Sequence, residues 1–262
     1  MLMSENTFRL RILPAYFTST VEEFKDEKPV HFVGYAKCNF NCDFCIFGQR
    51  SKHLELYPEY TLEQFEKKVW KLLTVSKNFK IVGGEPTLNP YVKDLARIIR
   101  LYGGKIYLDT NGSRPRIIKE MIEEGLVDVL GLSLKGLTPQ QAADTASITN
   151  TKLCWDNLFE SLELGSKAEN VRVLLTYVAC EGQFTDESLD TLGDFLAPYP
   201  DVILKINNCY NEEYLDGIKG LDKSEIYDMV KRFVERRPEY KGRTMLFKDH
   251  DSCVDKTQIA RF

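Results

Sequence analysis

The sequence has no long apolar segment. Its longest apolar runs, such as residues 129–132, are short, and none approaches the roughly 20 residues that a membrane-spanning helix needs. The first 13 residues contain Glu5, Arg9 and Arg11 where a secretory signal would carry an apolar stretch. We therefore expect no membrane span and a cytoplasmic location.

A strong excess of one charge is also missing. The 262 residues carry a formal net charge of −4, with 28% charged and 43% hydrophobic residues. This balance is ordinary for a soluble globular protein and argues against a general nucleic-acid binder. The length suits one barrel-type α/β domain with a full core.

The cysteines lack the even count and wide spread of a secreted disulfide framework. There are seven, and three of them fall within eight residues: Cys38, Cys42 and Cys45. Such a triplet indicates metal or redox chemistry. The other four stand singly, and we interpret three of these as buried core thiols, namely Cys154, Cys180 and Cys209.

Short β-rich runs alternate with amphipathic helical patterns, which predicts βαβ units and a parallel sheet. We expect strands at 30–35, 79–82, 105–108, 127–134, 171–178 and 202–206, with a possible last strand at 244–247. Helices are predicted at 61–75, 92–101, 115–124, 139–146, 155–164, 187–195 and 224–236.

Six such units predict an α/β fold with a partial (βα)6 TIM-type barrel, although an open doubly wound sheet fits the same pattern. The barrel would occupy residues 30–248, between an N-terminal extension, 1–29, and a C-terminal tail, 249–262.

The unusual residues lie at or just after the carboxyl ends of the predicted strands. In parallel α/β folds this edge is where functional sites are built. The segments concerned are 38–45, 83–86, 109–112, 133–135 and 207–208. We therefore expect them to meet in one site.

The triplet has the spacing C-x3-C-x2-C. Three thiolates so close in sequence can hold three corners of a cubane iron–sulfur cluster, and the absence of a local fourth ligand leaves one iron open. Structural zinc is the alternative, but it needs four ligands, and His31 and His53 do not stand at a zinc-finger spacing. His250, Asp251 and Cys253 are read as a solvated tail rather than a second metal site.

This pattern resembles the radical S-adenosylmethionine (SAM) superfamily, in which C-x3-C-x2-C follows the first barrel strand. Phe44 is aromatic, as is common there, and Gly83-Gly84-Glu85-Pro86 matches the family's G-G-E motif. The resemblance implies a [4Fe–4S] cluster on the triplet and SAM as cofactor. It also implies that the main chain at Phe44 packs on adenine, and that the glycines and Glu85 contact the SAM methionine.

A closer resemblance is to the activating enzymes of glycyl-radical proteins. Their D-T-N-G string is present as residues 109–112, so Asp109 and Asn111 would lie near SAM, although an Asx turn is the simpler interpretation of this string. Lys135 matches a lysine that pairs with the SAM carboxylate; otherwise it is a solvated charge at a strand end. Ser133 and Asn207 complete the implied cofactor contacts.

Four positions depart from these activating enzymes. Ser133 replaces an aspartate of a cation site, and Thr176 replaces an arginine. Asn207-Asn208 replaces a histidine, and Asp26 to Pro29 replaces a D-G-P-G lead.

The resemblance implies reductive cleavage of SAM, and a 5′-deoxyadenosyl radical that removes hydrogen from a substrate. An electron donor such as flavodoxin or ferredoxin is implied as a partner. The substrate is either a glycine of a partner glycyl-radical protein or a small, nucleotide-like molecule. A non-enzymatic metal-binding module is the third hypothesis.

Overall fold

The computed structural model describes residues 10–11, 30–35, 37–45, 59–74, 76–209, 218–248 and 259–262. His53, His250, Asp251 and Cys253 lie outside the described residues. Among the described helices, none combines the length and the apolar character that a membrane span requires.

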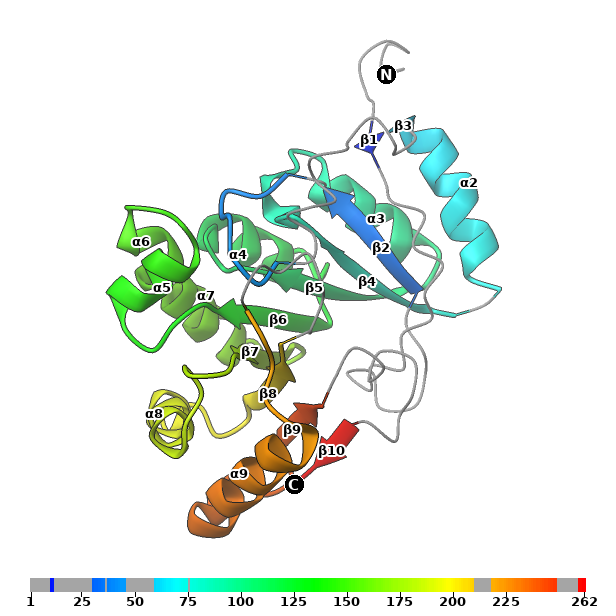
Figure 1. The fold of residues 1–262 in the computed structure, drawn as a ribbon. Coiled ribbons are helices and arrows are strands. Elements are labelled where there is room, and N and C mark those ends of the chain that lie inside the picture. Colours follow the sequence, from blue (N-terminus) through cyan, green and yellow to red (C-terminus); the bar gives the residue numbers. More distant parts are fainter. Residues whose placement is uncertain are drawn as a thin grey trace.

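One large sheet organises the described chain (Figure 1). Its order is β10-β9-β8-β7-β6-β5-β4-β2, and neighbouring strands are parallel except for β10, which is antiparallel to β9. The strands are β2 (Val30–Tyr35), β4 (Asn78–Gly83), β5 (Lys105–Thr110), β6 (Val129–Leu134), β7 (Arg172–Ala179), β8 (Ile203–Asn208), β9 (Thr244–Phe247) and β10 (Ile259–Arg261). A small second sheet pairs β1 (Leu10–Arg11) with β3 (Glu59–Tyr60).

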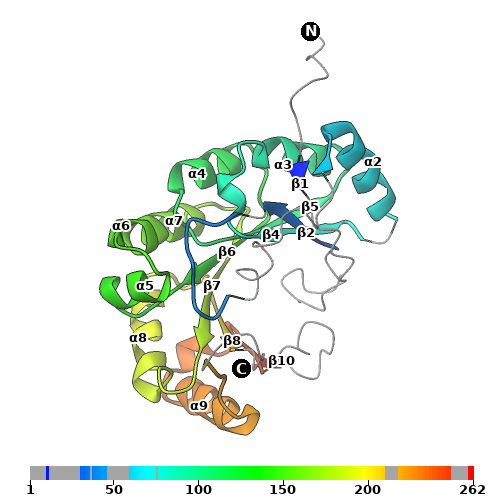
Figure 2. The ribbon, with the colours of Figure 1, turned by 45° about the horizontal axis from the view of Figure 1, so that its top comes forward.

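The helices form an arc on one side of the sheet (Figure 2). They are α2 (Leu62–Leu72), α3 (Val92–Leu101), α4 (Pro115–Glu123), α5 (Pro139–Thr145), α6 (Thr151–Cys154), α7 (Asp156–Ser166), α8 (Asp186–Leu196) and α9 (Lys223–Arg236). Because parallel strands joined in sequence order share one crossover hand, successive helices fall on the same face. The sheet order does not reverse, as a doubly wound sheet requires. The partial barrel is therefore confirmed, and the doubly wound alternative is wrong.

The predicted elements are present, with ends that shift by a few residues. Thr61 caps α2 through the predicted capping box with Gln64, but this helix ends at Leu72 rather than at 75. Helix α6, between α5 and α7, was not predicted. The predicted C-terminal tail ends in a strand, because β10 pairs with β9 and extends the sheet.

Alternate residues of the strands enter two separate cores. On β5, Ile106 and Leu108 pack between the sheet and the helices, whereas Tyr107 points into the barrel. The barrel interior is filled by a second apolar cluster of six buried residues: Tyr107, Val129, Leu174, Ile203, Met245 and Phe247. This cluster forms a floor beneath the carboxyl ends of the strands.

The helix-side core dominates the stability of the domain. Leu108 is fully buried in it, whereas Leu101 at the end of α3 is 72% exposed. We expect Leu108→Ala to lower the free energy of unfolding by about 2–5 kcal/mol, because it leaves a cavity. The matched change Leu101→Ala should cost less than about 0.5 kcal/mol. Urea unfolding measures both, and equal costs would contradict this assignment of the core.

Candidate active site

A cavity of about 310 Å³ lies at the carboxyl edge of the barrel. Polar, aromatic and sulfur-bearing side chains from the cysteine loop and from six strands surround it. Its lining includes Cys38, Cys42, Phe44, Cys45, Gly83, Gly84, Asp109, Asn111, Ser133, Lys135 and Asn207. The structure thus brings together every predicted site residue except Glu85.

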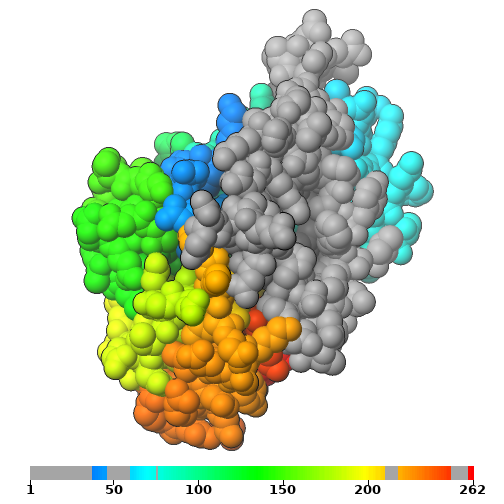
Figure 3. All heavy atoms as spheres, viewed as in Figure 1, coloured from blue at the N-terminus to red at the C-terminus, as the bar shows by residue number. Residues whose placement is uncertain are grey.

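The cysteine loop, residues 37–45, runs from β2 across the edge of the barrel to α5. The Asn41 N–H donates to the Ala146 carbonyl at 2.9 Å. Phe40 is buried against the alanines of α5 and against Cys154. Figure 3 shows the loop in blue beside the green atoms of this helical region. The loop is therefore anchored on the side opposite its parent strand.

Burial favours the protonated form of two thiols of this loop, those of Cys38 and Cys42. Burial raises the pKa of Cys38 to about 11, although the Phe40 N–H donates to its sulfur. Burial also raises the pKa of Cys42, and the nearby Lys135 charge opposes that rise. A bound cation of high charge stabilises thiolates in such surroundings.

The arrangement fits a cluster better than a single metal ion. Within the described ranges, no three His, Cys, Asp or Glu side chains converge closely enough to hold one metal ion. A cubane spreads three thiolates over three separate irons, so it tolerates this wider spacing. The three thiols and the adjoining cavity therefore suit a cluster with a neighbouring ligand.

Gly84 allows the cysteine loop to lie against the loop that follows β4. A Cβ atom at Gly84 would stand 2.2 Å from the Lys37 carbonyl oxygen and 2.9 Å from the Cys38 nitrogen. The next N–H, that of Glu85, donates to the Lys37 carbonyl at 2.8 Å. The close packing of these two loops therefore requires a glycine at position 84, independently of any cofactor.

Glu85 does not line the cavity, in contrast to the expectation that its carboxylate contacts SAM. It is fully buried and accepts hydrogen bonds from the Thr87 N–H and hydroxyl, the Thr110 hydroxyl and the Asn111 N–H. Burial raises its pKa, and these hydrogen bonds oppose the rise. The carboxylate therefore ties the loop after β4 to the loop after β5.

Asn111 connects this network to the cluster loop. Its side-chain oxygen accepts from the Ser113 N–H at 3.0 Å, which is the Asx turn considered above. Its Nδ2 donates to Asn39 at 2.9 Å and lies 3.8 Å from the Cys38 sulfur. The Asx turn is therefore present, and it aims the Asn111 amide at the cysteine loop.

Lys135 and Asp109 both line the cavity and have different partners. The Lys135 Nζ stands 5.4 Å from the centre of the Phe44 ring, a cation–π distance. The Asp109 carboxylate pairs with the Lys80 Nζ at 3.1 Å. Lys135 is therefore placed beside the aromatic residue of the cysteine motif, where a carboxylate of a cofactor would reach it.

The paired asparagines at the end of β8 have different roles. The Asn208 side chain donates to the Leu221 and Lys248 carbonyls and accepts from the Leu221 N–H, so it is a structural anchor. The Asn207 Oδ1 is buried without a hydrogen-bond partner and belongs to a residue that lines the cavity. Buried acceptors of this kind are usually satisfied by a donor, and an amino or hydroxyl group of a ligand in the cavity would supply one.

Sequence reasoning did not place several lining residues in the site, although it noted Thr176 as a departure from the activating enzymes. Lys80, Thr176 and Lys205 lie in the middle of strands, and all three are buried. In the sequence they look like charges and hydroxyls on a solvated face. Side chains alternate between the two faces of a strand, and these residues stand an even number of positions from side chains that point into the barrel. This alternation is the signal that could have identified them.

Cys180 and Cys209 are buried, as predicted, but they do not stand singly. They pack together near Phe44, and Cys209 lines the cavity. Cys180 is hydrogen-bonded to Cys209, and this contact together with burial raises its pKa. The pairing follows from the sheet register, because Ala179 and Asn208 are partners on β7 and β8.

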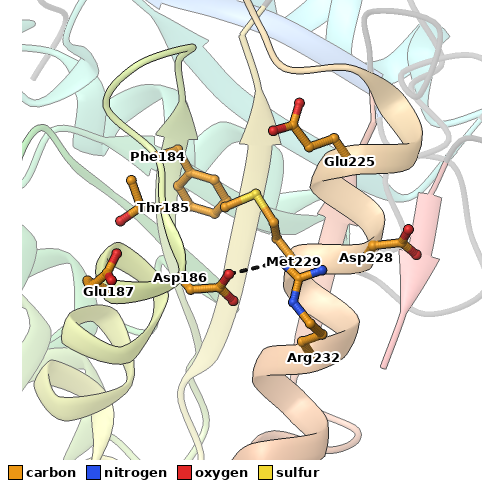
Figure 4. Close-up of a pocket in the computed structure, with 8 residues that line it drawn as sticks. All are labelled: Phe184, Thr185, Asp186, Glu187, Glu225, Asp228, Met229 and Arg232. Atoms are coloured by element: carbon orange, nitrogen blue, oxygen red, sulfur yellow. Dashed lines mark hydrogen bonds and ion pairs between the residues drawn. The ribbon is translucent and has the colours of Figure 1, made fainter.

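A second hollow, of about 460 Å³, lies between α8 and α9 (Figure 4). Its lining holds four carboxylates, and one of them, Asp186, pairs with Arg232 at 2.9 Å. It contains no residue of the cysteine loop and no strand-end asparagine or lysine. The cavity at the barrel edge is therefore the candidate active site.

The close approach at Gly84 has a measurable consequence. We expect Gly84→Ala to displace the cysteine loop and to lower the iron content after anaerobic reconstitution by at least about half, because backbone atoms cannot yield to the new methyl group. Gly103→Ala is the control, since nothing lies within 4 Å of its Cβ position and only its positive φ is strained. Equal iron contents in the two variants would contradict the packing role of Gly84.

Comparison with known proteins agrees with this geometry. The Radical SAM superfamily profile matches residues 32–196. A protein of Methanocaldococcus jannaschii assigned as a glycyl-radical enzyme activating enzyme is 26% identical over 199 residues, covering 72% of this chain and 73% of the relative. Molybdenum cofactor biosynthesis protein 1 of Dictyostelium discoideum is 25% identical over 219 residues, and the match covers 80% of this chain but only 32% of that protein.

A solved structure shares this fold. A radical SAM methyltransferase from Sphaerobacter thermophilus superposes with a TM-score of 0.63 at 14% identity, covering 83% of this chain and 66% of that one. Enzymes of this family use a [4Fe–4S] cluster and SAM. The profile match covers more than half of the sequence and includes the cysteine loop and the first five strands of the barrel, so this chain belongs to the radical SAM superfamily.

Proposed function

We propose that this chain holds a [4Fe–4S] cluster on Cys38, Cys42 and Cys45 and cleaves SAM reductively to remove hydrogen from a substrate. The observation that carries the proposal is that the three thiols share one cavity with Lys135 and Asn207. When bound, the cluster and SAM supply an electron and a carbon radical able to abstract hydrogen. The protein binds, orients and shields these groups.

Each lining residue has a task in this proposal. Lys135 receives the SAM carboxylate, and the Asn207 Oδ1 accepts a hydrogen bond from a SAM amino or hydroxyl group. Phe44 covers the cofactor with its main chain and packs near Lys135. Glu85 is a positioning residue, because it acts on the site only through Asn111 and the loops.

The proposal includes a one-electron donor such as flavodoxin or ferredoxin. It also includes a cytoplasmic location, where thiols remain reduced.

Reduction of the reconstituted protein in the presence of SAM tests this proposal. We expect wild-type protein to release 5′-deoxyadenosine and methionine, and Cys42→Ala to lose the four-iron spectrum and at least about 99% of the product, because one corner of the cubane is unbound. Cys154→Ser is the matched control, since it removes a buried thiol that does not line the cavity and it keeps the size of the side chain that packs against Phe40. Absence of 5′-deoxyadenosine from iron-loaded wild-type protein would contradict the proposal.

A glycine of a partner protein is one candidate substrate. The similarity to the Methanocaldococcus jannaschii protein supports it. If it is correct, anaerobic incubation with SAM, a reductant and a glycyl-radical protein from the same genome should give a doublet electron paramagnetic resonance signal. The control is a partner variant with its radical glycine replaced by alanine, and the same signal from that variant would contradict the assignment.

A small molecule is the second candidate substrate. The polar donors inside the barrel favour it, because a peptide backbone carries no charge for a buried lysine. The third hypothesis, a non-enzymatic metal-binding module, loses its support, since the family is one of enzymes.

A further inference from the structure

Three neighbouring strands present a row of hydrogen-bond donors to the cavity. Ser133 on β6 is the register partner of Thr176 on β7, and Thr176 is the register partner of Lys205 on β8. All three line the cavity. Register partners on adjacent strands point to the same face and lie about 5 Å apart. Two hydroxyls and an ammonium therefore stand side by side.

Lys205 is an unusual residue for this position. It is only 4% exposed, although lysine is rarely buried to this extent. Its Nζ lies 4.4 Å from the centre of the Phe247 ring, on the apolar floor of the barrel. A buried positive charge is screened less by water than an exposed one, so it attracts an anion more strongly.

The charged side chains around the cavity also favour an anionic ligand. Among the described residues that line it, there are three lysines and one carboxylate. That carboxylate, Asp109, pairs with Lys80, and Lys135 is assigned above to the SAM carboxylate. Among these described lining residues the positive side chains outnumber the negative one, which favours a ligand that carries negative charge.

The row lies deeper than the cofactor contacts. Val178 and Asn207 also line the cavity, and each stands two residues nearer the carboxyl edge than Thr176 and Lys205 respectively. Two residues along a strand correspond to about 6.6 Å. A ligand held by the row would thus have one end in the barrel and the other directed toward the cysteine loop.

We propose that Ser133, Thr176 and Lys205 form a subsite for the carboxylate or phosphate group of an anionic small-molecule substrate. This inference rests on the proposed function, because it places that substrate beneath SAM. The ammonium neutralises the anion, and the two hydroxyls donate to its remaining oxygens. The substrate is then oriented with its reactive C–H bond toward the cofactor edge.

Calorimetric titration of the cluster-loaded, oxidised protein saturated with SAM tests the subsite. The probes are inorganic phosphate and succinate, which distinguish the two oxyanion classes. Bound SAM occupies Lys135, so the probe reports on the deeper row. We expect saturable binding of at least one probe, and a dissociation constant raised roughly tenfold to a hundredfold by Lys205→Met.

Further variants make the result decisive. Lys205→Arg should recover part of the affinity, because it keeps the charge, and Thr176→Val should weaken binding without removing any charge. Lys231→Met is the matched control, since this lysine on α9 is 55% exposed. If Lys205→Met does not fold, as judged by thermal unfolding, Thr176→Val carries the test.

The outcomes separate the two proposals. Loss of probe binding in Lys205→Met or Thr176→Val, with 5′-deoxyadenosine still formed from SAM alone, supports the subsite. Absence of binding to wild-type protein, or equal binding by wild type and these variants, overturns it even if SAM is cleaved. Failure of wild-type protein to cleave SAM overturns the proposed function, whatever the titration shows.

Discussion

The contact between the Lys37 main chain and Gly84 is the constraint on which the site depends. It brings the loop after β2 against the loop after β4 at a distance that leaves no room for a Cβ atom. The hydrogen bond from the Glu85 N–H to the Lys37 carbonyl fixes the same approach. Because Cys38 follows directly, this backbone contact sets the position of the first cysteine of the triplet.

A buried polar network extends that constraint to the third loop. Glu85 accepts hydrogen bonds from Thr110 and Asn111, and the Asn111 amide reaches Asn39 and the Cys38 sulfur. A buried carboxylate is costly unless every oxygen is engaged, and here four donors engage it. The network thus makes three separate strand ends act as one rigid support for the cysteines.

The interior of the barrel has a different character from this support. An apolar floor carries a row of two hydroxyls and a lysine. Two members of the row, Ser133 and Thr176, are positions at which this chain departs from the activating enzymes that it resembles. Two of the departures thus fall in the proposed substrate subsite, whereas a third, at Asn207, lies nearer the carboxyl edge of the barrel.

The sequence alone determined the cofactor edge and the fold class. Three local patterns carried these predictions: the triplet spacing, the motif at 83–86, and the alternation of strands with helices. Local patterns can be recognised without knowledge of the tertiary contacts. Most predicted element ends differ from the observed ends by one to three residues, because caps and packing decide where a helix or strand stops.

Only the tertiary structure decided how distant residues combine. In the structure, Glu85 supports the loops from outside the cavity lining. Cys180 packs against Cys209, and Lys205 is the register partner of Thr176. Strand register and barrel curvature determine which of these distant residues come into contact. Neither property can be predicted from one segment of the sequence. From sequence alone, a lysine in the middle of a strand is predicted to be exposed to solvent. Only the fold shows which face of the strand points into the barrel.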